Sequence, residues 1–189
     1  MTQDALVSFF NKPETFARID RRDRDDASSS RRVVARDLEA ILAIERRSFD
    51  CPWTREEFEF CLEGRCLDGF VVEREHNVLG YLFYELRARK IRLLSCAVAE
   101  SERRQGIGSA LLSRLAEKLT PRRASVVCDV RERNVEGQLF LHSFGFRAQW
   151  VSRDYYGETH EDAYRMVYTL ESDVLLARER DAKRAAFLV

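Results

Sequence analysis

The sequence has no surplus of charge of either sign and no long apolar run. Its 32 basic and 32 acidic side chains give a formal net charge of zero over 189 residues. Broad binding to nucleic acid needs a surplus of Lys and Arg to neutralise phosphates, so direct nucleic-acid binding is not expected. No segment approaches the ~18 to 20 apolar residues that cross a bilayer, and residues 1–10 lack the pattern of a secretory signal. These absences predict a cytoplasmic protein with no membrane role.

Residues for metal or disulfide chemistry are also scarce. The cysteines are odd in number and contain no C-x-x-C pair, and the three histidines lie far apart in the sequence. We therefore expect reduced thiols, no disulfide framework and no metal site. The residues concerned are Cys51, Cys61, Cys66, Cys96 and Cys128, and His76, His142 and His160.

What the chain does contain is enough apolar material for one core. Hydrophobic residues make up 45% of the chain and charged residues 34%, which is typical of a single globular domain. Residues 1–31 are rich in mixed charge and serine and are interpreted as a flexible leader. A folded domain is predicted over 32–170, followed by an amphipathic helical tail over 171–189.

Apolar periodicity and turn residues predict the order of elements. Asp37 is expected to cap the first helix, and Thr54 with Glu57 has the spacing of a capping box for the second. Strands joined through a helix are expected to be parallel and those joined by short turns antiparallel, which predicts a mixed α/β sheet with helices on both faces. The predicted strands are 33–36, 70–75, 78–87, 91–98, 124–130, 146–155 and 163–170, and the predicted helices are 38–48, 55–63, 106–119 and 134–145.

One segment has the features of a phosphate-binding turn. A strand ending at Cys96-Ala97-Val98 is followed by Arg103-Arg104-Gln105-Gly106-Ile107-Gly108-Ser109 and then by an amphipathic helix. The glycines allow a ligand to approach the backbone, and the first helical turn offers unpaired N–H groups and a positive dipole end. A Walker loop would need a Lys after the second glycine and a dinucleotide fingerprint would need a third glycine, and neither is present.

The spacing R-x-x-G-x-G, here Arg103, Gly106 and Gly108, resembles the acetyl-CoA site of the GNAT N-acetyltransferases. The segments at 129–134 and 143–146 are similar to the following strand, helix and G-F closure of that family. Cys51-Pro52-Trp53-Thr54, and 153–156 together with 161–163, resemble one branch, the ribosomal-protein-alanine N-acetyltransferases, which modify protein N-termini. The resemblance covers about residues 33 to 170.

This resemblance implies a GNAT fold, whose mostly antiparallel mixed sheet is splayed where acetyl-CoA, the co-substrate, binds. It implies that backbone groups of one strand pair with the pantetheine arm, that the following turn holds the pyrophosphate, and that the start of the next helix reaches the pantetheine. The implied cofactor-binding residues are Cys96, Ala97, Val98, Arg103, Arg104, Gln105, Gly106, Ile107, Gly108, Ser109 and Asn134.

The resemblance also implies direct attack of an amine on the thioester, without an acyl-enzyme. Asp129 stands where the family branch has a Glu that accepts the amine proton. Because Asp is one carbon shorter, a bridging water is expected, and a salt-bridged edge residue is the alternative interpretation. The family's general acid is a Tyr, but Leu141 stands at that position. Tyr155 or Tyr156 could replace it, or the two could grip the peptide; we assign Tyr155 to catalysis and Tyr156 to substrate binding.

The predicted reaction is transfer of acetyl to a protein N-terminal α-amine, with a ribosomal protein as one candidate acceptor, by a monomer or weak dimer. Trp53 is predicted to line the peptide groove, with core packing as the alternative, and Glu161 and Asp162 could hold a positively charged acceptor. Transfer to a Lys side chain or to a small-molecule amine remains open. So does a catalytically weak module that binds acyl-CoA.

Overall fold

The structure, a computed structural model, describes residues 29–171 and divides into two compact units. Among the described residues, the N-terminal unit contains 29–87 and 91–118, and the C-terminal unit contains 88–90 and 119–171. The predicted helical tail, apart from residue 171, and the leader up to residue 28 lie outside the described residues. The boundaries of the folded domain stay a prediction.

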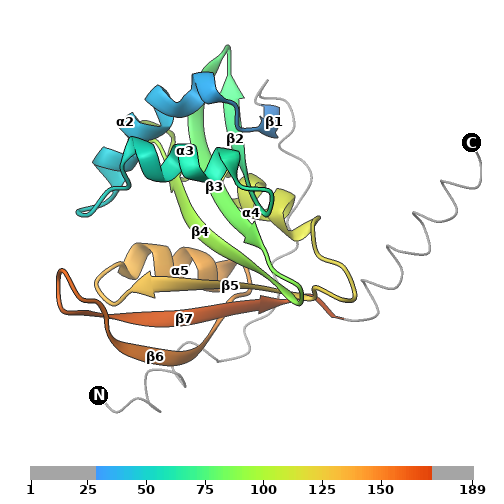
Figure 1. The fold of residues 1–189 in the computed structure, drawn as a ribbon, viewed down its shortest axis with the longest axis vertical. Coiled ribbons are helices and arrows are strands. Elements are labelled where there is room, and N and C mark those ends of the chain that lie inside the picture. Colours follow the sequence, from blue (N-terminus) through green and yellow to red (C-terminus); the bar gives the residue numbers. More distant parts are fainter. Residues whose placement is uncertain (1–28, 172–189) are drawn as a thin grey trace, which may run out of the picture. The chain divides into compact units, whose positions relative to one another are not determined.

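The described part of the N-terminal unit is built on an antiparallel meander (Figure 1). Neighbouring strands pair in sequence order, as predicted for the three strands joined by short turns. The strand predicted at 33–36 is wrong: β1 lies four residues earlier, and Ala35–Asp37 form a 3-10 turn. The Ser and Arg residues of β1 have no apolar alternation that would predict a strand. The segment is a strand because its backbone pairs with the edge of β2. The strands are β1 (Ser29–Arg32), β2 (Leu67–Arg74), β3 (Asn77–Leu86) and β4 (Lys90–Val98).

The three predicted helices of this unit are confirmed as α2 (Leu38–Ser48), α3 (Arg55–Glu63) and α4 (Ile107–Ala116). The capping box of α3 is present, since the Glu57 N–H donates to Thr54 Oγ1 over 3.3 Å and the Thr54 N–H donates to Glu57 Oε2 over 2.7 Å. Asp37 stands at the N-cap position of α2, as predicted, but its side chain makes no capping hydrogen bond to that helix. Its carboxylate accepts the Val34 N–H at 2.9 Å and pairs with Arg31 at 2.7 Å, so it ties β1 to the 3-10 turn instead. Helix α4 ends at Ala116, three residues before the predicted end.

Helices cover both faces of this sheet. Side chains of α2 and α3 pack with Val71, Tyr81 and Phe83 in one core. Successive strand residues point to opposite faces, and the Arg114 and Lys118 cations at the end of α4 lie over the ring of Phe70, which neighbours Val71. Helix α4 therefore lies on the face opposite α2 and α3.

The described part of the C-terminal unit is an antiparallel sheet, in the order β5-β7-β6, with one helix (Figure 1). The elements are β5 (Ser125–Arg131), α5 (Val135–Ser143), β6 (Arg147–Tyr156) and β7 (Glu161–Thr169), all close to their predicted positions. Asn134 caps α5, accepting the Gly137 N–H at 2.8 Å. Just after α5, the Phe144 ring packs 5.6 Å from Tyr168 on β7, so this face of the sheet is the one that α5 covers. Val126 on β5 pairs with Tyr168, and Asp129 is three residues further along β5. Because successive strand residues alternate between faces, the Asp129 side chain projects from the opposite face.

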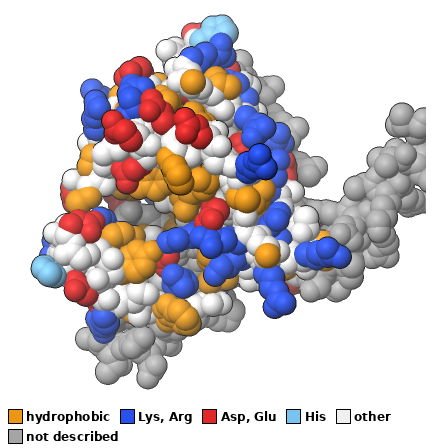
Figure 2. Space-filling model, in the orientation of Figure 1, with side chains coloured by type: hydrophobic (Ala, Val, Ile, Leu, Met, Phe, Trp, Pro, Cys, Tyr) orange, Lys and Arg blue, Asp and Glu red, His pale blue; other side chains and the backbone are white. Residues whose placement is uncertain are grey.

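On the face of the molecule drawn in Figure 2, acidic side chains gather around α3. That helix carries Glu56, Glu57, Glu59 and Glu63. Within residues 29–171, no helix is long and apolar enough to cross a membrane.

Candidate active site

The predicted phosphate-binding turn is exposed and adopts the backbone conformation that its glycine allows. Gly106, the N-cap of α4, has a φ of +82°, and a Cβ built there would meet no atom within 4 Å. Arg104 also lies in the left-handed region, with a φ of +64°. The chain thus enters the left-handed region twice within three residues just before α4 begins. The turn therefore presents backbone N–H groups with open space beside them.

Charge and helix geometry favour an anion at this turn. The side chains of Arg103, Arg104 and Gln105 are exposed, whereas that of Ile107 is buried. Arg103 Nε donates to the Val98 carbonyl over 3.3 Å, which ties the turn to the end of β4. The first backbone bond into the helix is from Ala110 to the Gly106 carbonyl at 2.9 Å, so the N–H groups of 107–109 have no partner within α4. Two exposed arginines thus stand within four residues of a helix N-terminus, which gives this turn a positive character.

A close approach of α4 to the sheet fixes this geometry. Gly80 on β3 lies where a Cβ would meet the Ala97 carbonyl at 3.0 Å and Ile107 Cγ2 at 3.1 Å. A larger residue would push the first turn of α4 away from the end of β4. The structure therefore brings the predicted residues 96–98 and 103–109 together in the N-terminal unit.

The Cys96 thiol is not poised for nucleophilic chemistry. Burial raises the pKa of the Cys96 thiol to about 12, so the thiol stays protonated at neutral pH. All five cysteines are free, with Cys51 and Cys66 exposed. No group of three or more His, Cys, Asp or Glu side chains within 29–171 could hold a metal ion.

Asp129, the predicted proton acceptor, is held by an arginine that the sequence analysis missed. Arg165 on β7 donates from Nε to Oδ1 at 2.8 Å and from Nη2 to Oδ2 at 3.1 Å. The Asp129 side chain is only 6% exposed, and the Arg165 guanidinium lies 5.5 Å from the exposed Trp150 ring. A bridging water would have to share the carboxylate with Arg165. The signal for this pair was the single cation in an otherwise uncharged stretch of the predicted strand 163–170.

Both predicted tyrosines meet Asp129. The Tyr155 hydroxyl donates to Asp129 Oδ2 over 3.4 Å, and the Tyr156 hydroxyl donates to its backbone carbonyl over 3.1 Å. Consecutive residues of a regular strand point to opposite faces, but β6 is irregular between Ser152 and Tyr156, and Asp154 has a φ of +48°. This bulge turns both rings toward β5. Tyr155 is partly exposed, and burial raises the pKa of Tyr156 to about 12.

Leu141, which the resemblance places at the position of the family's general acid, is buried. Leu141 is 7% exposed on α5, so it serves as a core residue of the C-terminal unit. Asn134, predicted to reach the cofactor, uses Oδ1 to cap α5, which leaves the Nδ2 donor of its amide as the end that could face a ligand.

Trp53 packs at the edge of the core, as its alternative interpretation predicted, and its role in a peptide groove stays a prediction. Its ring packs 5.3 Å from Phe58 at the edge of the core but remains partly exposed. Its backbone N–H donates to Glu45 Oε1 over 2.9 Å. The α2–α3 connection that carries Trp53 is therefore anchored on a carboxylate inside the N-terminal unit.

Glu45 is a buried acid that the sequence analysis missed. It is 1% exposed, and its Oε2 accepts hydrogen bonds from the Tyr81 hydroxyl on β3 and, at 3.5 Å, from Ser95 Oγ on β4. Burial, and to a smaller degree the nearby charge of Glu57, raises the pKa of Glu45 to about 7, against the opposing effect of its hydrogen bonds. The sequence does contain a sign of this buried acid. Glu45 follows Leu42 by three residues and Ile41 by four, which places it on the apolar face of α2.

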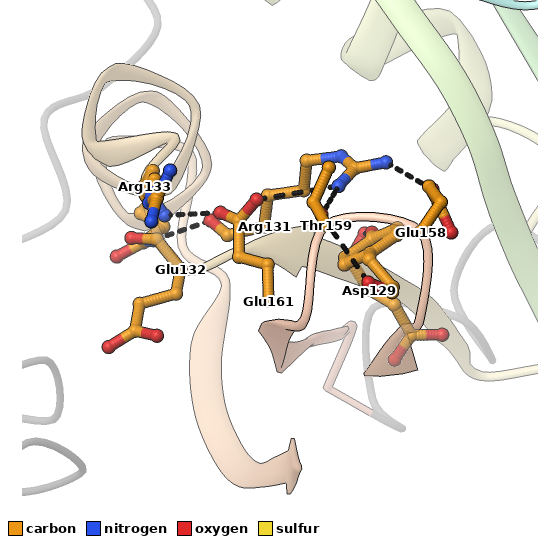
Figure 3. A network of polar contacts seen from close by, with 9 residues as sticks. Asp129, Arg131, Glu132, Arg133, Glu158, Thr159 and Glu161 are labelled. Carbon is orange, nitrogen blue, oxygen red and sulfur yellow. Dashed lines mark hydrogen bonds and ion pairs between the residues drawn. The ribbon is translucent and has the colours of Figure 1, made fainter. Parts of the chain in front are cut away.

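The two acids predicted to attract a charged acceptor have internal partners. Glu161, which is 7% exposed, accepts the Arg133 N–H at 2.8 Å and lies 3.4 Å from Arg131 (Figure 3). Asp162 pairs with Arg153 and accepts the Asp154 N–H at 2.9 Å. Asp162 thus links β7 to β6 within the hairpin, whereas Glu161 links the start of β7 to the end of β5 and the turn after it.

Comparison with known proteins matches this architecture to a family. Residues 38–146 match the acetyltransferase (GNAT) family. The [ribosomal protein bS18]-alanine N-acetyltransferase of Escherichia coli strain K12 is 30% identical over 133 residues, which cover 69% of this chain and 89% of that protein.

Solved structures share the fold. The crystal structure of the ribosomal-protein-S18-alanine N-acetyltransferase from Escherichia coli superimposes with a TM-score of 0.68 at 26% identity, covering 76% of this chain and 94% of that one. Arabidopsis thaliana NAA60 in complex with acetyl-CoA gives a TM-score of 0.67 at 19% identity, covering 76% and 98% of the two chains. These likenesses confirm the predicted α/β GNAT fold.

Proposed function

The chain belongs to the acetyltransferase (GNAT) family and is an N-acetyltransferase, and from this premise we propose that it transfers acetyl from acetyl-CoA to the α-amine at a protein N-terminus. The observation that carries the proposal is the exposed turn from Arg103 to Ser109, with its left-handed Gly106 and the N-terminus of α4. The name of the Escherichia coli relative supports an N-terminal alanine of a ribosomal protein as the acceptor.

Acetyl-CoA fits the residues of this turn by charge and by space. Its pyrophosphate would accept hydrogen bonds from backbone N–H groups of 107–109 and from Arg103 and Arg104, which are exposed. Gly106 leaves open space where a side chain would otherwise stand. The backbone of Cys96, Ala97 and Val98 would pair with the pantetheine arm, and Asn134 would reach it with its amide nitrogen.

The reaction joins the amine nitrogen to the acetyl carbonyl carbon and breaks the carbon–sulfur bond. The amine loses one proton, and the departing thiolate gains one, so that an amide and CoA thiol result. Burial raises the pKa of the Cys96 thiol to about 12, so this thiol is a poor nucleophile for forming an acyl-enzyme. The proposal is therefore direct transfer in a ternary complex.

Asp129 and Tyr155 are proposed as the proton-handling pair. Asp129 accepts from the Tyr155 hydroxyl over 3.4 Å, which places an acceptor and a donor side by side on β5 and β6. The ion pair of Asp129 with Arg165, and the leucine at position 141, make this pair a less effective base and acid than a free Glu and a Tyr would be. A terminal α-amine, with a pKa of about 7.7 to 8.0 against ~10.4 for Lys, asks less of such a base.

Thiol release from acetyl-CoA tests the function. The purified protein is supplied with short peptides that carry a free N-terminal Ala, Ser or Met, and with N-blocked peptides that contain Lys. Release with free N-termini alone supports the proposal, and release with Lys peptides alone refutes the α-amine as acceptor. Asp129→Asn is expected to lower kcat with little change in acetyl-CoA affinity, and full activity of this variant would remove Asp129 from the mechanism. A cytoplasmic location and a monomer or weak dimer remain predictions.

A further inference from the structure

One side chain of the C-terminal unit, that of Arg131, connects three parts of the β6–β7 hairpin (Figure 3). From the end of β5, its Nη2 donates to Glu158 over 2.8 Å and its Nη1 donates to Thr159 Oγ1 over 2.8 Å. Its guanidinium also lies 3.8 Å from the centre of the Tyr156 ring. The planar fork of arginine makes these contacts together, which the single ammonium group of lysine cannot do.

The nitrogen that donates to Thr159 also contacts Glu161. One of its oxygens lies 3.4 Å from Arg131 Nη1, and the other accepts the backbone N–H of Arg133 at 2.8 Å. The Glu161 side chain is 8% exposed and that of Arg131 is 23% exposed, so the pair is more sheltered than Glu158, which is 60% exposed. Charge-assisted bonds in such a setting stabilise more than surface pairs do.

These contacts link two segments that carry predicted site residues. The β6–β7 hairpin presents Tyr155 and Tyr156 beside Asp129. The turn after β5 leads through Arg133 to Asn134, the cap of α5. A second bond, from the Glu132 N–H to the Asp162 carbonyl at 3.0 Å, runs parallel to the Glu161 contact.

We propose that Arg131 and Glu161 are positioning residues of the site: Arg131 holds the hairpin that presents the two tyrosines to the acceptor, and Glu161 joins that hairpin to the turn leading into Asn134. The inference rests on the proposed function, because the acceptor and acetyl-CoA are its readouts. The proposal gives the two residues different effects. Arg131 affects binding of the acceptor, whereas Glu161 affects binding of both the acceptor and acetyl-CoA.

Three variants test the proposal. Arg131→Lys keeps the charge but loses the fork, and it should raise the KM for an acceptor peptide about tenfold, the effect of one lost charge-assisted bond, with little change in the Kd of acetyl-CoA. Glu161→Ala should weaken the binding of both the acceptor peptide and acetyl-CoA. Glu161→Gln retains an oxygen that can accept the Arg133 N–H but loses the charge that pairs with Arg131. Compared with Glu161→Ala, it should therefore bind acetyl-CoA with the affinity of the wild-type protein, while its KM for the acceptor stays raised. Glu117→Ala, which breaks an exposed arginine pair in the N-terminal unit, is the control.

Amide hydrogen exchange supplies a readout that needs no acceptor. The Thr159 N–H, bonded to the Tyr156 carbonyl at 3.0 Å, should exchange faster in Arg131→Lys, and the Arg133 N–H should exchange faster in Glu161→Ala than in Glu161→Gln. If the wild-type protein acetylates no peptide, the proposed function fails. The hydrogen-exchange rates of the variants then test by themselves whether Arg131 and Glu161 hold the hairpin and the turn. Unchanged exchange, or an unchanged acceptor KM in an active protein carrying Arg131→Lys, would overturn the proposal.

Discussion

The buried acid Glu45 predicts how stability depends on pH. Its carboxylate is 1% exposed and its pKa is raised from 4.5 to about 7. Between these pH values the folded state binds the Glu45 proton more tightly than the unfolded chain does, so the free energy of unfolding falls as pH rises. At 1.36 kcal/mol for each pKa unit, the full penalty is on the order of 3 kcal/mol, and it is complete above the folded-state pKa.

The substitution Glu45→Gln removes this titration while keeping an oxygen for the Trp53 N–H. Urea unfolding followed by circular dichroism at pH 5, 6, 7 and 8 gives the free energy of unfolding for both proteins. Relative to the variant, the wild-type protein should lose about 2.5 kcal/mol from pH 5 to pH 8, because part of the penalty is already present at pH 5. Glu117→Gln, at an exposed ion pair, should show a difference that does not change with pH. Parallel curves for the wild-type protein and Glu45→Gln would refute the burial argument.

Three further outcomes are expected. Arg104→Ala should weaken acetyl-CoA binding about tenfold by calorimetry, since a charge-assisted bond is lost, while Arg114→Ala leaves it unchanged; equal affinities would contradict the phosphate assignment. Asn134→Ala should lower the free energy of unfolding by about 1 kcal/mol through the lost helix cap, and Asn134→Asp should restore most of it; the absence of a Tm change would argue against the cap. Iodoacetamide at pH 8 should modify Cys51 and Cys66 in the folded protein but not Cys96, whose pKa is about 12; rapid labelling of Cys96 would show an open thiol.

Local signals were sufficient for most elements and for the phosphate-binding turn. The capping box at Thr54 and the cap at Asn134 are decided by residues three apart, and both are present as predicted. Strand β1 was misplaced because its pairing with β2 spans about forty residues and leaves no apolar pattern. The left-handed Gly106 needed only its own neighbours to be recognised as a turn.

The surroundings of the acids could not be predicted in the same way. Asp129 was correctly singled out as a candidate, but Arg165 reaches it across the β5–β7 register, 36 residues away. The bulge that turns Tyr155 and Tyr156 to the same partner depends on backbone geometry at Asp154, which side-chain type does not reveal. Glu45 was overlooked because its partners on β3 and β4 become neighbours only when the sheet forms.

The central claim is transfer of acetyl to a terminal α-amine, and the position of the acetyl group on the product tests it most directly. A peptide with a free N-terminal Ala and one internal Lys is incubated with acetyl-CoA and the protein, and the product is fragmented in a mass spectrometer. The account predicts a single acetyl group on the α-amine, and none when the N-terminus is blocked. Acetyl on the Lys side chain, with the α-amine left free, would contradict it.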